Sequence, residues 1–223
     1  VSGAVNPNYR EVLKTYCHAA DLILREIAFD PASGLTSHSP HLNSLLTPHS
    51  SCLIIQQPNF FGNLETVSGL AEKVHSAGSL FIVSVDPISL GLLKPPGEYG
   101  ADIVVGEGQS LGIPMNFGGP GLGLFATKKE YLRQMPGRIA SATVDGDGRR
   151  GFVLTLATRE QHIRRERATS NICTNEALCA LAACVYLSVM GKQGLRKVAA
   201  LCLQKANYAK RLMGGKVVWP KTP

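Results

Sequence analysis

Short apolar runs separated by polar turns dominate residues 50–130. The runs "CLIIQ", "LFIVSV", "DIVVG" and "GLGLFAT" are brief and almost continuously apolar, which is typical of strands covered on both faces. After the first run, Leu64, Val67, Leu70, Ala71 and Val74 recur at helical spacing, and Gly78 follows as a stop. The connections are long enough for crossovers, so the pattern predicts an α/β domain with a mainly parallel sheet flanked by helices.

The flanking segments extend this prediction. Asn6 and Pro7 suit the start of a helix. Residues 22–29 favour a strand, and residues 42–46 favour a short helix. Further on, "RIASATV" and "FVLTLAT" favour two strands joined by a turn at residues 145–151. From Arg159 the chain reads as helical up to Gly214, in successive segments with a broad apolar surface.

Composition excludes several classes of protein. The net charge is +7, but the basic residues are scattered and aromatic residues make up only 6% of the chain, so we expect no nucleic-acid partner. No uninterrupted run of about 18 apolar residues appears, and the first residues lack the regions of a signal peptide. We therefore expect no membrane association and a cytoplasmic location. The six cysteines form no CxxC pair and favour free thiols.

Candidate site residues follow the predicted strands, because ligands of open α/β sheets bind beyond the carboxyl ends of the strands. Asn59 and Phe60 follow the first strand, and Asp86 follows the second, where a carboxylate could pair with a protonated ring nitrogen. Residues 107–110 follow the third strand, and the glycine-rich residues 116–121 come next. Glycine-rich backbone can hold a phosphate, but each of these segments is also consistent with an ordinary turn, which is the simpler interpretation of the glycines taken alone.

Other kinds of catalytic or binding site find little support. The six histidines form neither HExxH nor a Cys/His metal spacing, and GK[ST], GxGxxG and GxSxG are absent; we expect no metal site. The arginines at 159, 164, 165 and 167 lie among glutamates over one or two helical turns. They favour a solvated face with internal ion pairs, or a contact with a substrate carboxylate or another subunit.

Longer strings across nearly the whole chain resemble the P-protein family of glycine decarboxylases, specifically subunit 1 of its two-polypeptide form. They include "PNFFGNLE", "GADIVVGEGQSLGIPMNFGGPGLGLFATKKEYLRQMPGRI" and "DGDGRRGFVLTLATREQHIRRERATSNICTNEALCAL". The resemblance implies the large domain of a type I pyridoxal phosphate (PLP) transferase. It also implies a fragment: residues 1–213 as a large domain shortened at its N-terminus, and residues 214–223 as the start of a missing C-terminal small domain.

In that family a lysine of subunit 2 binds PLP covalently as a Schiff base. The alignment places Gln109 at the position of this lysine, and no lysine occurs between Lys94 and Lys128. An amide cannot form an imine, so this chain alone is expected to be inactive. The resemblance further implies that several residues contact the cofactor or the interface with subunit 2; these are Asn59, Phe60, Asp86, Gln109, Phe117, Gly118, Gly119, Gly121, Ser170, Asn171 and Thr174. For Asp86, a structural remnant of duplication is the alternative.

The reaction implied is that of glycine dehydrogenase (aminomethyl-transferring), an oxidoreductase of the glycine cleavage system. The assembled α2β2 heterotetramer decarboxylates glycine and transfers the aminomethyl group to the lipoyl arm of the H-protein, for which a basic surface suits an acidic carrier. Two alternatives stay open. One is a non-catalytic scaffold for subunit 2, and the other is an independent PLP-dependent lyase or aminotransferase, against which the missing lysine argues.

Overall fold

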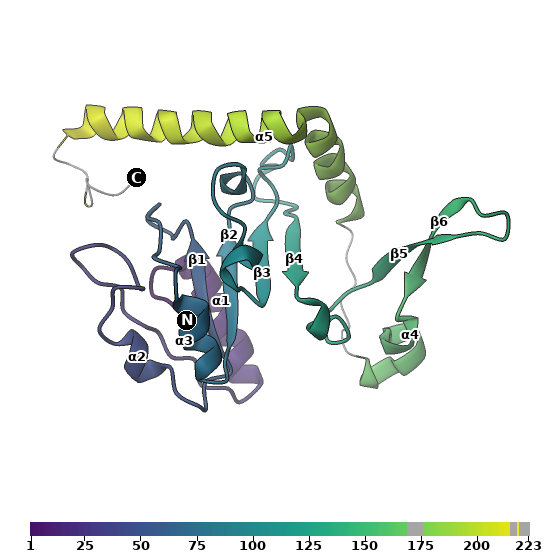
Figure 1. Ribbon diagram of the computed structural model, residues 1–223, viewed down its shortest axis with the longest axis horizontal. Helices are drawn as coiled ribbons and strands as arrows, with labels where there is room; N and C mark the ends of the chain where they lie inside the picture. Colours follow the sequence, from purple (N-terminus) through teal and green to yellow (C-terminus); the bar gives the residue numbers. More distant parts are fainter. Residues whose placement is uncertain (169–175, 215–217, 219–223) are drawn as a thin grey trace. The chain divides into compact units, whose positions relative to one another are not determined.

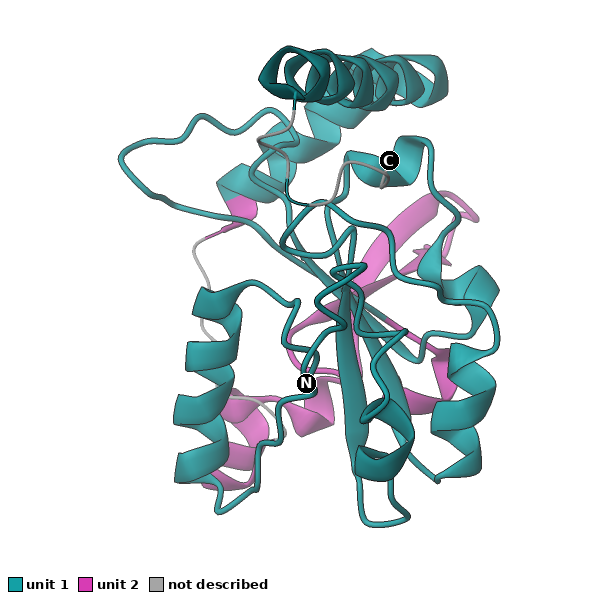
Figure 2. Ribbon diagram, turned by 90° about the vertical axis from the view of Figure 1, so that its left-hand side faces the viewer, with its two compact units in different colours: residues 1–126, 178–223 teal, residues 127–177 magenta. Residues whose placement is uncertain are grey.

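The computed structural model describes residues 1–168, 176–214 and 218. Its helices and strands are α1 (Pro7–Ala19), α2 (Leu42–Leu45), β1 (Cys52–Gln57), α3 (Leu70–Ser76), β2 (Leu80–Val85), β3 (Ile103–Glu107), β4 (Gly123–Thr127), β5 (Ile139–Val144), β6 (Arg150–Thr155), α4 (Gln161–Arg164) and α5 (Ala177–Met213). Single 3-10 turns lie at η1 (Ser89–Gly91), η2 (Pro96–Tyr99), η3 (Lys129–Tyr131), η4 (Ala157–Arg159) and η5 (Arg165–Arg167). Two compact units result, unit 1 with residues 1–126 and 178–223 and unit 2 with residues 127–177 (Figure 2).

Unit 1 is built on a sheet of four strands in the order β1-β2-β3-β4 (Figure 1). The first three strands are parallel: Cys52 pairs with Leu80, and Ile82 pairs with Ile103. The α/β prediction with a mainly parallel sheet is thus confirmed, and the parallel strands bring their carboxyl ends to one edge.

The two faces of this sheet are covered unequally. On one face, buried side chains such as Leu53, Phe81 and Val83 pack with Leu70 and Val74 of α3 into the main apolar cluster. On the opposite face, α1 leaves Ile54, Ile82, Ile103 and Val105 half-buried around a cavity of about 470 Å³. The near-continuous apolar runs predicted strands covered on both faces, and the structure buries one face of β1 and β2 fully and that of β3 and β4 only in part.

The start of α1 agrees with the sequence. Asn6 is the N-cap, with its side-chain oxygen accepting a hydrogen bond from the Asn8 N–H, and Pro7 occupies the first turn. The short helix predicted at residues 42–46 is present as α2, from Leu42 to Leu45.

Three predicted elements differ from the structure. Residues 22–29 do not form a strand, because only Ile27 is buried, and it bridges Ser2. The helix predicted from Leu64 begins at Leu70, because Gly69 at its N-cap has a left-handed backbone with φ of 73°. After Arg159 the structure forms only the four-residue α4 and 3-10 turns before the undescribed residues 169–175.

Unit 2 contains the predicted pair of strands. β5 and β6 form an antiparallel ladder in which Ala142 pairs with Phe152. The Asp145 carboxylate accepts hydrogen bonds from the Asp147 and Arg149 N–H groups and so closes the turn.

α5 joins two helical segments at Gly191, whose backbone (φ 59°, ψ −176°) is not helical (Figure 1). By length and composition it could cross a membrane, since one 18-residue window has a mean hydropathy of 1.4. Polar residues such as Ser188 and Lys192 interrupt α5, so it contains no uninterrupted apolar run of that length. Core helices of soluble proteins meet the same criteria, so the finding is weak evidence.

Candidate functional site

A polar cavity of about 310 Å³ lies at the carboxyl edge of the sheet. Asp86 directly follows β2, Glu107 ends β3, and Gln109 and Ser110 come next; Tyr9, Gln56, Ser84 and Val85 complete the lining. Parallel register explains the meeting, because Val85 pairs with Gly106 and so brings the two strands to an end side by side. The structure therefore brings two predicted site residues, Asp86 and Gln109, to one cavity.

Carboxylates set the charge of this cavity. Asp86 and Glu107 both line it, and no lysine or arginine is among its described lining residues. Burial and the negative charge of Glu107 raise the pKa of the Tyr9 phenol. One Asp86 oxygen accepts the Ile88 N–H at 3.0 Å. The cavity thus suits a cation or a neutral polar group better than a phosphate.

Gln109 braces the backbone instead of offering an amine. Its side-chain nitrogen lies 3.5 Å from the carbonyl oxygens of both Pro114 and Met115. The backbone N–H of Gln109 donates a hydrogen bond to Glu107 Oε1 at 2.9 Å. Because the described lining of the cavity includes neither a lysine nor a cation for a phosphate, these residues do not fit a PLP molecule bound covalently to this chain.

The predicted glycine-rich segment forms the tip of the connection between β3 and β4. Asn116, Phe117 and Gly118 all have positive φ, at 43°, 57° and 104°, and Phe117 is fully exposed. The N–H groups of Gly118 and Gly119 both donate to the Met115 carbonyl. Within the described chain, Gly121 is therefore the one of these three predicted glycines whose N–H has no partner inside the loop.

Asn59 and Phe60 have different surroundings. Asn59 is buried: its amide donates to the Gly34 carbonyl and to Glu65 Oε1, and its oxygen accepts the N–H groups of Phe61 and Asn63. All its hydrogen bonds are thus used to shape the turn. Phe60 is exposed beside Phe61, with ring centroids 5.7 Å apart. Neither Asn59 nor Phe60 lines the cavity at the strand ends.

Ser170, Asn171 and Thr174 lie outside the described residues, so their predicted role stays a prediction. The arginine-rich segment is described up to Ala168. Arg159 is buried, and its Nη2 donates to the Gly137 carbonyl at 2.6 Å, while Nε and Nη1 have no partner in the described chain. Arg167 is exposed, and its Nε lies 3.9 Å from Oε1 of Glu166. The predicted ion-paired, solvated face therefore describes Arg167 but not Arg159.

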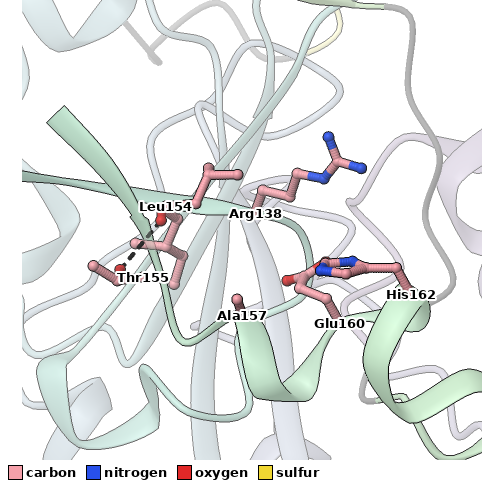
Figure 3. Close-up of a pocket in the computed structure, with 7 residues that line it drawn as sticks. Arg138, Leu154, Thr155, Ala157, Glu160 and His162 are labelled. Carbon is pink, nitrogen blue, oxygen red and sulfur yellow. Dashed lines mark hydrogen bonds between the residues drawn. The ribbon is translucent and has the colours of Figure 1, made fainter.

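A second cavity of about 320 Å³ lies within unit 2 (Figure 3). Apolar Ile139, Leu154 and Ala157 line it together with Arg138, Thr155, Glu160 and His162. The Thr155 hydroxyl donates to the Ile139 carbonyl at 3.1 Å and is thereby occupied. Sequence reasoning did not find this cavity, because its residues come from β5, β6, η4, α4 and the segments beside them, which no motif connects.

Glu107 is the residue that sequence reasoning missed at the first site. It belongs to the predicted segment 107–110, but the sequence assigns it no role of its own. Its signal is positional: a carboxylate at the last residue of a strand, followed by glycine, can accept hydrogen bonds from the next turn. The structure shows this, since Glu107 Oε1 accepts from the N–H groups of Gln109 and Leu122.

Solved structures with this fold identify its class. A crystal structure of glycine decarboxylase (P-protein) of the glycine cleavage system, in inhibitor-bound form, matches with a TM-score of 0.81 and 49% identity, over 88% of this chain and 43% of that one. Sphingosine-1-phosphate lyase of Burkholderia pseudomallei matches with a TM-score of 0.57 and 13% identity, over 89% of this chain and 42% of that one, a likeness of fold alone. The fold is the α/β fold of type I PLP-dependent transferases, as predicted.

Sequence comparison narrows the class to a family. The family model described as glycine cleavage system P-protein matches residues 1–218, and the chain belongs to this family. It is 56% identical over 213 residues to the probable glycine dehydrogenase (decarboxylating) subunit 1 of Desulforamulus reducens, and 52% identical over 219 residues to that of Thermomicrobium roseum. These matches cover 96% and 98% of this chain but 47% and 48% of the relatives. The chain thus spans about half the length of the curated relatives it matches.

Proposed function

We propose that this chain is part of the lysine-lacking subunit of a two-polypeptide glycine decarboxylase. The identity of 56% with a relative named subunit 1 is the observation that carries the proposal. In the assembled enzyme, an α2β2 heterotetramer with subunit 2, glycine is decarboxylated and its aminomethyl group passes to the lipoyl arm of the H-protein. PLP, when bound by the lysine of subunit 2, supplies an electron sink for this decarboxylation.

The role of this chain in that assembly is to shape a site that it does not itself complete. Gln109 stands where the lysine would be required, and its amide is turned to backbone carbonyls. The loop of residues 115–121 carries exposed Met115 and Phe117. We assign this loop the contact with the cofactor site of subunit 2, and we assign exposed Phe60 to the same interface.

Assembly also suits the exposed apolar side chains of α5. Large exposed side chains on this helix include Leu178, Leu181, Val185, Val189 and Leu212. Contiguous exposed apolar surface is typical of an interface, so we assign α5 to contact with another polypeptide rather than to a membrane. The net charge of +7 suits an acidic carrier protein. The location proposed is cytoplasmic, with residues 1–213 belonging to a PLP-transferase large domain and residues 214–223 leading into a small domain.

Glycine-dependent exchange of carbon dioxide tests this function. A full-length version of this subunit, subunit 2 and their mixture are each assayed with PLP and lipoylated H-protein. Activity only in the mixture supports complementing subunits. Activity of this subunit alone would mean that it carries its own site, and the proposal would fail.

A scaffold that only stabilises subunit 2 is the second candidate, favoured by the exposed apolar residues of α5. Replacing Gly118 and Gly121 by alanine separates the two. Gly118 has a φ of 104°, so a Cβ atom there strains the backbone, and a Cβ atom on Gly121 would displace the Glu107 carboxylate. Unchanged turnover of the assembled variant would favour the scaffold; reduced turnover with intact assembly favours a loop that contributes to the site.

A further inference from the structure

The β3–β4 connection is closed at its base by one carboxylate. Glu107 Oε1 accepts the Gln109 N–H at 2.9 Å and the Leu122 N–H at 2.7 Å, so a single oxygen joins the two ends of the connection. Beside it, the Gly108 N–H donates to the Leu122 carbonyl at 2.7 Å. Hydrogen bonds to a carboxylate are stronger than those between neutral groups, so Glu107 restrains the loop strongly at its base.

Close packing adds to this restraint. A Cβ atom on Gly121 would lie 2.7 Å from Glu107 Oε2, and one on Gly108 would lie 3.0 Å from the Leu122 side chain. Neither position has room for a side chain without a shift of the carboxylate or of Leu122. The two glycines thus let the carboxylate reach both ends of the connection.

The tip that this base supports is held in an unusual conformation. Asn116 and Phe117 have positive φ, which costs free energy for residues with a Cβ atom. Both Met115 and Phe117 nevertheless point apolar side chains into solvent, at 78% and 113% exposure. The side-chain nitrogen of Gln109 also restrains the tip, through its contacts with the backbone carbonyls of Pro114 and Met115.

We infer that Glu107 and Gln109 are positioning residues that hold the loop of residues 115–121 ready for a partner polypeptide, Glu107 with the larger effect. The amide at the position of the missing lysine thus has a structural task. The inference deepens the proposed function, because the partner it serves is subunit 2. A loop held in its binding conformation loses less conformational entropy on association than a free one.

Hydrogen exchange of the isolated chain tests whether Glu107 and Gln109 hold the loop, without any assay of activity. In Glu107→Ala, amide exchange at Gln109, Leu122 and the loop between them should rise by about 10-fold, while exchange in β1 stays unchanged. Glu107→Gln keeps an oxygen that can accept both N–H groups and should restore protection to within about 3-fold of wild type. Glu72→Ala, an exposed glutamate of α3, is the matched control. Gln109→Leu should raise exchange by only about 2-fold, since its contacts are long.

Two results of the exchange experiment would overturn the inference. One is unchanged loop exchange in Glu107→Ala, and the other is an equal rise in β1, which would show that the carboxylate supports the whole fold. With subunit 2 present, Glu107→Ala should lower turnover by about 10-fold and weaken assembly, with rescue by Glu107→Gln. Normal turnover and normal assembly despite a loosened loop would also overturn it. If wild-type subunits assemble without glycine activity, the proposed function fails. The positioning role of Glu107 and Gln109 is then tested by hydrogen exchange and assembly alone.

Discussion

Different kinds of interaction stabilise unit 1 and unit 2, each within itself. Unit 1 has two clusters of buried apolar side chains, one around Phe81 and one around Leu111 and Cys179. In unit 2, the described residues 127–168 and 176–177 include no buried apolar side chain, and Arg159 is the buried residue among them. The conformation of unit 2 is instead held by the β5–β6 ladder, the turn at Asp145 and the hydrogen bond between Arg159 and the Gly137 carbonyl.

This difference matters because a two-stranded hairpin alone is marginally stable in water. On one face of the hairpin, Ala140, Ala142, Val144, Phe152 and Leu154 are all exposed. Apolar side chains that bury nothing in the chain add little to its stability. The comparison therefore separates residues that stabilise this chain from residues available to a partner.

Phe81→Ala and Phe152→Ala should show the largest contrast. Phe81 is fully buried in unit 1, whereas Phe152 is 65% exposed in β6. We expect Phe81→Ala to lower the free energy of unfolding by about 3–5 kcal/mol and Phe152→Ala by less than about 0.5 kcal/mol. Urea denaturation followed by circular dichroism measures both. Equal losses would mean that the two aromatic side chains are equivalent and the comparison is wrong.

Removing a buried carboxylate from unit 1 should have the next largest effect. Asp102 Oδ2 accepts the Phe81 N–H at 2.7 Å and lies 2.8 Å from His75 Nε2. Asp102→Ala leaves the Phe81 N–H unpaired inside the protein, and should cost about 2–3 kcal/mol. His75→Ala removes only the partly exposed partner and should cost about 1 kcal/mol. A larger loss for His75→Ala in the same denaturation experiment would assign the stabilisation to the imidazole.

The sequence predicted the parts of the fold in which each residue depends on its near neighbours. Parallel strands β1 to β3, the Asn6 cap and the β5–β6 pair all follow from short patterns. The helix expected from Leu64 failed because Gly69 adopts a left-handed backbone and Glu65 is drawn into a buried network with Thr36, Ser37 and Asn59. Such contacts span about 30 residues in sequence and leave no periodic signal.

The candidate site was predictable in position but not in detail. The rule that ligands bind beyond parallel strands placed Asp86 and Gln109 at one edge, and both line one cavity. The rule could not show that the Asn59 side chain uses its hydrogen bonds inside the chain. Nor could it show that Glu107 accepts a hydrogen bond from Leu122, 15 residues further on. These hydrogen bonds depend on the direction in which each side chain points in the folded protein, and short sequence patterns do not reveal that direction.

Tyr99→Phe should stabilise unit 1, opposite in sign to the two core variants. Tyr99 packs near Phe81, with centroids 6.4 Å apart, and its hydroxyl is buried without a partner in the described chain. Removing an unpaired buried hydroxyl should raise the free energy of unfolding by about 1 kcal/mol. Thermal denaturation at neutral pH measures this, and a loss of stability would show that the hydroxyl has a partner.

The same variant should respond differently to alkaline pH. Burial raises the pKa of Tyr99 to about 12 from its usual 10.0. The unfolded chain therefore releases this proton first, so the stability that depends on the neutral phenol is complete below pH 10 and falls as pH rises toward 12. Wild type should lose stability relative to Tyr99→Phe across this window. Parallel curves for the two proteins would contradict the raised pKa.

The smallest expected effect lies in unit 2. The Arg150 guanidinium lies 5.1 Å from the centroid of the exposed Phe152 ring, and cation–π contacts at exposed sites contribute about 0.5 kcal/mol.

Arg150→Ala should therefore leave global stability almost unchanged while shifting the Phe152 ring resonances in NMR. Arg149→Ala, which removes a neighbouring exposed arginine close to Asp147, is the control and should leave the ring unaffected. If Arg150→Ala instead cost about 2 kcal/mol or more, far above the range for an exposed contact, the hairpin would stabilise this chain as the core does, and its apolar face would no longer be free for a partner.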